Sequence, residues 1–297
     1  MTAPARRSGT VALVGRPNAG KSTLVNALVG HKVAIVSDKP QTTRRRLLGF
    51  RTEARGQLVF VDTPGLHKPL HRLNRAMLDE ALEAIRDVDV RVLVIDAAEK
   101  EGGGERYALE LMGQSPEPRL LVLNKIDLVP KNRLLPRMAA LFETRLFEEV
   151  VPLSALTGDG VERLVEVLFR YVPEGDDLYP EAEHTLTATE VRYAELIREK
   201  LLERTREEIP YGLGVVVEEV ERRGAKDLTV VTATIVVDKE NHKGIVLGRG
   251  GALLKDAATA ARLEMEQTFG GRFYLDLRVA AHPGWREDPR FLIRLTS

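Results

Sequence analysis

Gly15-Arg-Pro-Asn-Ala-Gly-Lys-Ser22 is the most informative stretch of this chain. It matches the pattern G-x-x-x-x-G-K-[ST], follows the apolar run 11–14 and precedes a helix-like segment over 21–29. In such a unit the glycines let backbone N–H groups turn toward phosphate oxygens. We expect Lys21 to reach the β- and γ-phosphates of a nucleotide and Ser22 to hold Mg²⁺; the alternative is an unliganded Gly-rich turn. The expected nucleotide contacts here are Gly15, Arg16, Pro17, Asn18, Ala19, Gly20, Lys21, Ser22 and Thr23.

Short apolar runs alternate with helix-like segments on both sides of this stretch, as far as residue 172. Such runs are typical of buried parallel strands joined by crossover helices. One pair differs, because 44–51 and 57–61 flank the turn 53–56 and predict an antiparallel hairpin at the sheet edge. We therefore predict a doubly wound α/β domain with a mostly parallel sheet. The other expected strands are 11–14, 92–95, 120–123 and 150–153, and the expected helices are 21–29, 75–86, 105–112, 134–147 and 161–171.

Asp62-Thr-Pro-Gly65 follows an apolar run and lies forty residues after the end of the phosphate-loop motif. Taken alone, this tetrapeptide is more often a simple turn. After a phosphate loop, Asp62 is expected to bind Mg²⁺ through water, and the Gly65 N–H to sense the γ-phosphate. Thr63 and Pro64 are expected beside the nucleotide for the same reason.

Asn124-Lys-Ile-Asp127 ends the apolar run 120–123. A carboxylate accepts hydrogen bonds from both N1–H and the exocyclic amine of guanine, a pair that adenine does not offer. We assign that role to Asp127, with Asn124 at the base edge and Lys125 covering the ring. Ser154 and Ala155, after the last run, are expected to offer backbone contacts to guanine O6. The alternative is that Asp127 only caps a helix.

These four elements occur in the order found in P-loop GTPases, and the chain resembles that class. Gln41-Thr-Thr-Arg44 lies where the class keeps its first switch loop, and one threonine there completes the Mg²⁺ shell. We favour Thr43, and Thr42 stays open. The expected catalytic residues are Lys21, Thr43 and Gly65, and the expected Mg²⁺ residues are Ser22, Thr43 and Asp62.

Two positions bear on hydrolysis of GTP to GDP and phosphate. Leu66 stands where many GTPases have a glutamine that orients the attacking water, so intrinsic turnover is expected to be slow. Asn18 is shared with GTPases that use K⁺, and it is a candidate K⁺ ligand. The alternative is that Asn18 only shapes the phosphate loop.

The composition sets broad limits on compartment and partners. The 297 residues include 44 basic and 44 acidic side chains, so the chain has no overall basic charge that would indicate a nucleic-acid partner. It has no cysteine, which excludes disulfides, thiolate metal sites and cysteine nucleophiles. With no signal-like N-terminus and no apolar run long enough to span a membrane, we expect a cytoplasmic protein.

The pattern changes after a turn-rich, acidic linker at 173–188. A helix over 190–207, strands over 213–221 and 228–237, helices near 240–246 and over 252–269, and a strand over 272–280 predict a small α+β domain. Gly248-Arg-Gly-Gly251 falls between the last two helices. The α-β-β-α-α-β order with this loop resembles a type II KH domain, whose G-x-x-G loop lets a nucleic-acid backbone approach closely.

Local charge agrees with this interpretation, because 241–262 contains four basic residues against Asp256 alone. Ile245, Val246 and Leu247 either form a base-stacking floor or pack in the core. Arg44, Arg45 and Arg46 beside the switch either contact RNA or the second domain, or form a solvated strand face. The alternative for the whole domain is that G-x-x-G is a structural turn and the domain binds protein. The expected RNA contacts are Lys243, Gly248, Arg249, Gly250, Gly251 and Lys255.

With both halves placed, the whole chain resembles the bacterial Era GTPase family. The resemblance rests on the motifs quoted above, together with Leu66-His67 and Pro210-Tyr211. It implies a GTPase domain over 1–172, a linker over 173–188 and a type II KH domain over 189–297. It further implies binding to the 3′ end of 16S rRNA during small-subunit maturation, a monomer, and occasional peripheral contact with the inner face of the cell membrane.

Overall fold

The computed structural model describes residues 5–39, 42–44, 46–65, 72–99, 102–113, 117–224, 227–288 and 291. Its described residues form two compact units. The first contains the chain up to Ala34 and most of the chain from Thr43 to Leu186, and the second contains Ile35–Thr42, residues 72–74 and the chain from Thr187 onward.

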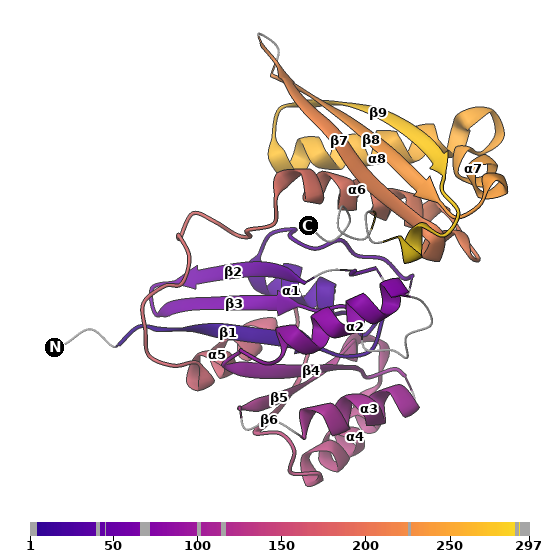
Figure 1. The fold of residues 1–297 in the computed structure, drawn as a ribbon. Helices are drawn as coiled ribbons and strands as arrows, with labels where there is room; N and C mark the ends of the chain where they lie inside the picture. The colour runs from indigo at the N-terminus through magenta and orange to yellow at the C-terminus, as the bar shows by residue number, and fades with distance from the viewer. Residues whose placement is uncertain are drawn as a thin grey trace. The chain divides into compact units, whose positions relative to one another are not determined.

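The first unit is built on a six-stranded sheet with the order β2-β3-β1-β4-β5-β6 (Figure 1). Every neighbouring pair is parallel except β2–β3, which is antiparallel and lies at the sheet edge. This confirms the predicted doubly wound, mostly parallel sheet with an edge hairpin. The strands are β1 Arg7–Val14, β2 Leu47–Glu53, β3 Gly56–Asp62, β4 Val90–Asp96, β5 Arg119–Asn124 and β6 Glu149–Pro152.

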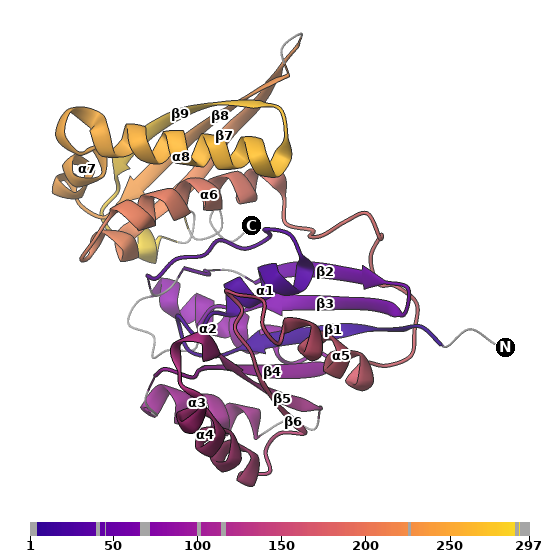
Figure 2. The same ribbon diagram turned by 180° about the vertical axis from the view of Figure 1, so that it is seen from behind.

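Helices cover both faces of this sheet because its strands bury alternate side chains on opposite sides. In β1, Val11 and Leu13 pack into a core with α1 and α5, whereas Ala12 and Val14 pack into a second core with α2, α3 and α4 (Figures 1 and 2). The helices are α1 Lys21–Val29, α2 Arg72–Ala84, α3 Gly103–Met112, α4 Lys131–Glu143 and α5 Val161–Tyr171. The predicted helix 134–147 is therefore wrong at both ends: the chain is already helical at Lys131, and Arg145 has a φ of 54° that no α-helix continues through.

The segment expected to be a linker packs against the first unit along much of its length. The backbone N–H groups of Leu178 and Tyr179 both donate to Gln57 Oε1 at 2.9 Å. The Tyr179 ring stacks on Phe50 with centroids 4.3 Å apart, and the Phe50 N–H donates to the carbonyl of His184. The absence of periodicity in this segment therefore reflects an extended strap bound to the sheet edge.

The second unit has the predicted α-β-β-α-α-β order. Its three-stranded sheet has the order β7-β8-β9, antiparallel for β7–β8 and parallel for β8–β9. Helices α6, α7 and α8 supply the apolar residues that pack with the sheet in one core, and Figure 2 shows α6 and α8 in front of the sheet. The elements are α6 Thr189–Arg204, β7 Leu213–Arg223, β8 Leu228–Val237, α7 Glu240–Leu247, α8 Ala252–Phe269 and β9 Arg272–Ala281.

Candidate nucleotide site and nucleic-acid interface

The phosphate loop joins the end of β1 to the start of α1, and its backbone explains its glycines. Gly15 and Gly20 have φ values of 156° and 91°. A Cβ on Gly20 would lie 2.3 Å from Asn124 Nδ2, and one on Gly15 would lie 2.4 Å from the Val94 carbonyl oxygen. Asn18 has a φ of 63°, which asparagine tolerates better than most residues, so it also shapes the loop.

Lys21 is the first residue of α1 and its side chain is buried against the loop. Its Nζ donates to the carbonyls of Gly15 at 3.1 Å and Arg16 at 3.0 Å. Burial lowers the pKa of Lys21 to about 8, against the opposing attraction of Asp62. A buried ammonium at the start of a helix attracts an anion, as expected for the β- and γ-phosphates.

The three residues expected at Mg²⁺ lie together. Ser22 Oγ is 2.8 Å from Thr43 Oγ1 and donates to Asp62 Oδ2 at 2.7 Å. Asp62 is fully buried, and burial raises its pKa although Lys21 and the two hydroxyls lower it. Its Oδ1 has no hydrogen-bond partner within the described part of the chain. One orphaned carboxylate oxygen with two hydroxyls fits Mg²⁺, which prefers oxygen ligands and keeps several waters.

The remaining switch residues divide between the two units. The Thr42 hydroxyl donates to the Lys39 carbonyl at 2.6 Å and the Thr42 carbonyl accepts from Arg198, both within the second unit. The geometry thus brings Thr43, and not Thr42, to Ser22 and Asp62. Arg44 is buried at 6% exposure, which excludes the alternative of a solvated strand face for this residue, whereas Arg46 is exposed. Gln41, Arg45, Leu66 and His67 lie outside the described residues.

The Asp62-Thr-Pro-Gly65 segment closes against the phosphate loop. Thr63 Oγ1 donates to the Leu13 carbonyl at 2.8 Å, which ties the segment to β1. A Cβ on Gly65 would lie 2.7 Å from the Pro17 nitrogen, so a glycine is needed for this close approach. Gly65 therefore lies directly beside the phosphate loop.

The Asn124–Asp127 motif begins at the end of β5. Asn124 is buried: its Nδ2 donates to the Ala19 carbonyl and its Oδ1 accepts from the Ala155 N–H, both at 2.9 Å. Asn124 thus ties the phosphate loop to the Ser154–Ala155 loop, a role that the expectation of a base-edge contact did not include. Lys125 has a φ of 63°, and Asp127 is exposed in the turn that follows.

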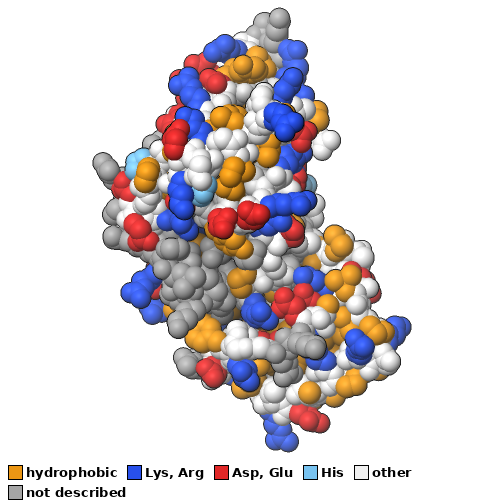
Figure 3. Space-filling model, turned by 90° about the vertical axis from the view of Figure 1, so that its right-hand side faces the viewer, with side chains coloured by type: hydrophobic (Ala, Val, Ile, Leu, Met, Phe, Trp, Pro, Cys, Tyr) orange, Lys and Arg blue, Asp and Glu red, His pale blue; other side chains and the backbone are white. Residues whose placement is uncertain are grey.

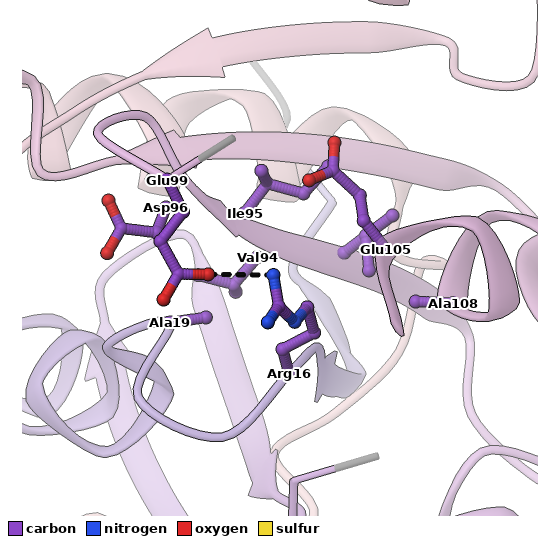
Figure 4. Close-up of a pocket in the computed structure, with 9 residues that line it drawn as sticks. Arg16, Ala19, Val94, Ile95, Asp96, Glu99, Glu105 and Ala108 are labelled. Atoms are coloured by element: carbon purple, nitrogen blue, oxygen red, sulfur yellow. Dashed lines mark hydrogen bonds and ion pairs between the residues drawn. The ribbon is translucent and has the colours of Figure 1, made fainter. Parts of the chain in front are cut away.

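The sequence reasoning missed Asp96, the last residue of β4, and Glu99, three residues after it. Asp96 Oδ2 pairs with Lys125 Nζ at 2.6 Å, and Glu99 Oε2 pairs with Arg16 Nη1 at 2.8 Å (Figure 4). Asp96, Glu99 and Arg16 line a pocket of about 10 Å³ beside the phosphate loop. A signal was available, because Asp96 ends its apolar run just as Asp62 and Asn124 end theirs, and strand ends of a parallel sheet meet at one edge.

The G-x-x-G loop joins α7 to α8 in the second unit. Gly248, Gly250 and Gly251 have φ values of 72°, 61° and 79°. A Cβ on Gly248 would lie 2.7 Å from Leu253 Cβ, whereas the corresponding positions on Gly250 and Gly251 have no atom within 4 Å. Gly248 is thus needed by the fold, while Gly250 and Gly251 leave space for an approaching chain.

A groove of about 430 Å³ opens beside this loop, between α8 and β9. Lys255 and Gly251, both expected to contact RNA, line it. So do Thr259, Arg262 and Tyr274, which were not among the expected contacts. Their shared position follows from β9 running alongside α8, which spacing along the chain does not reveal.

The apolar residues just before the G-x-x-G loop differ in burial. Val246 is fully buried and belongs to the core, which excludes it from a base-stacking floor, whereas Ile245 is 49% exposed. Lys243 Nζ lies 3.5 Å from Glu240 Oε1. On the face shown in Figure 3, basic and acidic side chains lie beside one another in small groups, and the chain as a whole has no net charge.

Known proteins match this chain in both units. A family described as 50S ribosome-binding GTPase matches residues 10–125, and the KH domain family matches residues 208–286. The chain is 44% identical to GTPase Era of Geotalea uraniireducens, covering 98% of each chain. It is 42% identical to GTPase Era of Geobacter metallireducens, covering 97% of each.

Two solved structures are similar over 98% of this chain and 99% of their own, each at 36% identity. One is Era in complex with MgGDPNP and nucleotides 1506–1542 of 16S ribosomal RNA, with a TM-score of 0.94. The other is an Aquifex aeolicus Era variant bound to GDP and AlF4⁻, with a TM-score of 0.93. With the phosphate loop, the guanine motif and the KH fold in place, the chain belongs to the GTPase Era family.

Proposed function

We propose that this chain is a GTP-controlled switch that binds 16S rRNA near its 3′ end through its KH domain and acts in small ribosomal subunit assembly. The observation that carries the proposal is the open side of Gly250 and Gly251 beside a groove lined by Lys255 and Arg262. The choice of RNA is supported by the similar Era structure, which contains nucleotides 1506–1542 of 16S ribosomal RNA.

In the nucleotide site, each side chain has a proposed task. Lys21 contacts the β- and γ-phosphates, while Ser22 and Thr43 hold Mg²⁺ directly and Asp62 holds it through water. Mg²⁺ supplies charge neutralisation when it is bound. The Gly65 N–H contacts the γ-phosphate. With Leu66 in place of a glutamine, the protein itself offers no side chain there to orient the water, so intrinsic hydrolysis is slow.

Asp127 reads guanine with its carboxylate, and Lys125 covers the ring. The Asn124 amide, bonded at both ends, fixes the position of this motif relative to the phosphate loop. Replacing Asp127 with Asn is expected to shift preference from guanine toward xanthine nucleotides, because the amide donates where the carboxylate accepts. Unchanged guanine preference would contradict the assignment.

In the KH domain, the backbone of an RNA strand passes over Gly250 and Gly251. Lys255 and Arg262 neutralise phosphates, and Tyr274, which is 59% exposed, offers a ring for a base to stack on. Lys243, Gly248 and Arg249 complete the proposed RNA surface. The domain thus combines close backbone approach with local positive charge.

The decisive experiment measures affinity for a 3′-terminal 16S rRNA fragment with GDP and with a non-hydrolysable GTP analogue. We expect the two nucleotides to give different affinities, since the proposal requires hydrolysis to release RNA. Equal affinities would contradict the coupling. Loss of RNA binding by Gly251→Asp, with nucleotide binding intact, separates this function from a protein-binding second domain, which would retain its partner without binding RNA.

We further propose a cytoplasmic monomer that contacts the inner membrane face peripherally, and K⁺ activation through Asn18. The family resemblance supports the membrane contact. Asn18 in the phosphate loop supports the K⁺ site. None of the helices in the described part of the chain has the length and apolar character needed to cross a bilayer. Flotation with anionic vesicles tests the membrane contact, and equal hydrolysis rates in KCl and NaCl would dismiss K⁺.

A further inference from the structure

The segment that leaves the end of β4, residues 96–99, touches both halves of the nucleotide site. At its start, Asp96 Oδ2 pairs with Lys125 Nζ at 2.6 Å, and Asp96 Oδ1 accepts from the Ala98 N–H at 2.8 Å. At its end, Glu99 pairs with Arg16 of the phosphate loop at 2.8 Å (Figure 4). We refer to residues 96–99 as the β4 loop.

Arg137 of α4 holds the β4 loop by its backbone. Arg137 Nη1 donates to three carbonyls, those of Asp96 at 3.1 Å, Ala97 at 2.9 Å and Glu99 at 2.6 Å. Arg137 Nη2 donates to both carboxylate oxygens of Glu105 at 3.3 and 3.2 Å. A planar fork with fixed donors satisfies both groups at once, which the single ammonium of a lysine does not match.

The buried ion pair between Arg137 and Glu105 serves to orient the β4 loop. Glu105 is 4% exposed and the Arg137 side chain 15% exposed. A buried ion pair gives little net stability relative to apolar packing, because desolvation of both charges offsets their attraction. It does, however, fix geometry, and the carbonyls it fixes belong to the loop that carries Asp96.

The two ends of the β4 loop are not equivalent. The Glu99–Arg16 pair is exposed, with side-chain exposures of 45% and 36%, so its contribution is small. Asp96 is 9% exposed at its side chain and makes the shorter contact, to Lys125. Disturbing the loop should therefore affect the base side of the nucleotide site more than the phosphate side.

We propose that Arg137 is a positioning residue for the guanine base: through the β4 loop it holds Asp96 against Lys125 and so fixes the Asn124–Asp127 motif. Arg137 touches no nucleotide in this scheme. The proposal rests on the assignment of Asn124–Asp127 as the guanine motif, made above. It extends the site by a residue from α4, on the far side of the β4 loop.

The test compares Arg137→Met, Arg137→Lys and the control Arg133→Met, an exposed arginine of the same helix. Affinities for GDP and for Mg²⁺-pyrophosphate are measured for each full-length variant. Arg137→Met is expected to weaken GDP binding roughly ten-fold and to leave pyrophosphate binding unchanged, since Asp96 acts on the base side through Lys125, whereas the exposed Glu99–Arg16 pair contributes little on the phosphate side. The GDP affinity of Arg137→Lys is expected to lie between those of the wild type and Arg137→Met. The GDP affinity of Arg133→Met is expected to match that of the wild type.

The route through Asp96 is tested by a double-mutant cycle. If Arg137 acts through Asp96, the double variant that combines Asp96→Asn with Arg137→Met loses no more GDP affinity than the stronger of the two single variants. If the losses of GDP affinity in the two single variants add up in the double variant, Arg137 does not act through Asp96. If Arg137→Met weakens the binding of GDP and of pyrophosphate equally, Arg137 does not position the base. If Arg137→Met does not fold, the same two affinities of Arg137→Lys decide. Asp127→Asn, measured in parallel, separates failure of the guanine assignment from failure of this proposal.

Discussion

The nucleotide site and the G-x-x-G loop present charge in opposite ways. In the first, Lys21 is 6% exposed and Asp62 is fully buried, and both are placed by contacts inside the protein. In the second, Arg249 and Gly250 are exposed and the loop is shaped by positive φ values. A small ligand is thus bound by buried, preorganised groups, whereas a polymer binds to exposed backbone and surface charge.

The largest expected effect comes from removing the buried cation. Lys21→Met should weaken GDP and GTP by about 100-fold or more, because each charge-assisted hydrogen bond contributes about 1.5–3 kcal/mol. Titration calorimetry with GDP measures it, with Lys131→Met, an exposed lysine of α4, as the control. GDP affinity near the wild-type value would show that burial does not make Lys21 decisive.

The open glycine should matter to RNA and little to the fold. Gly251→Asp places a carboxylate where no atom lies within 4 Å and is expected to weaken RNA roughly ten-fold or more by repulsion of phosphate. Its cost to folding is strain at positive φ, about 1–2 kcal/mol.

Gly248→Ala serves as the matched comparison, because its new Cβ meets Leu253 Cβ at 2.7 Å. It should lower the melting temperature more than Gly251→Asp does. RNA binding by filter assay and melting by circular dichroism check both variants. The reverse order of melting temperatures would break the division between structural and binding glycines.

Tyr274 tests whether the groove extends the loop. Tyr274→Ala should weaken the binding of single-stranded RNA by about 1–3 kcal/mol, the range measured for a base stacked on an aromatic ring. Tyr107 is another exposed tyrosine, at 42% exposure in the first unit, and Tyr107→Ala should leave RNA affinity unchanged. Equal effects of the two variants would remove Tyr274 from the RNA surface.

The smallest effect is the pH dependence of nucleotide binding. Lys21 has a pKa of about 8 in the free protein, and bound phosphates stabilise its charged form and raise that pKa. Binding at pH 8 therefore takes up about half a proton, and affinity falls about two-fold between pH 7 and pH 8. Calorimetry in two buffers of different ionisation enthalpy measures the uptake.

The same shift affects folding without nucleotide. An unfolded lysine keeps its proton up to its ordinary pKa of 10.5, while the folded one releases it near 8. The unfolded state thus binds more protons in this window, so stability rises with pH between those values. A pH-independent affinity and a flat stability curve above pH 8 would contradict the burial of a charged Lys21.

Some elements of this protein were predictable because their causes are local. The phosphate loop follows from eight consecutive residues, and helices 161–171 and 252–269 and the strand 228–237 agree with the structure at both ends. Glycine, apolar periodicity and turn residues act within a few positions, so a single sequence reveals them. The neutral total charge was the least informative property, because charge acts locally.

Other features arise only when the chain folds. Arg137 meets Asp96 from 41 residues away, and Tyr274 joins Lys255 because β9 runs beside α8. The sequence favours Thr43 but leaves Thr42 open, and only the structure shows that the Thr43 hydroxyl comes within 2.8 Å of Ser22 Oγ. Local propensity determines elements and motifs, whereas their mutual placement depends on strand register and core packing, which join residues that are distant in the chain.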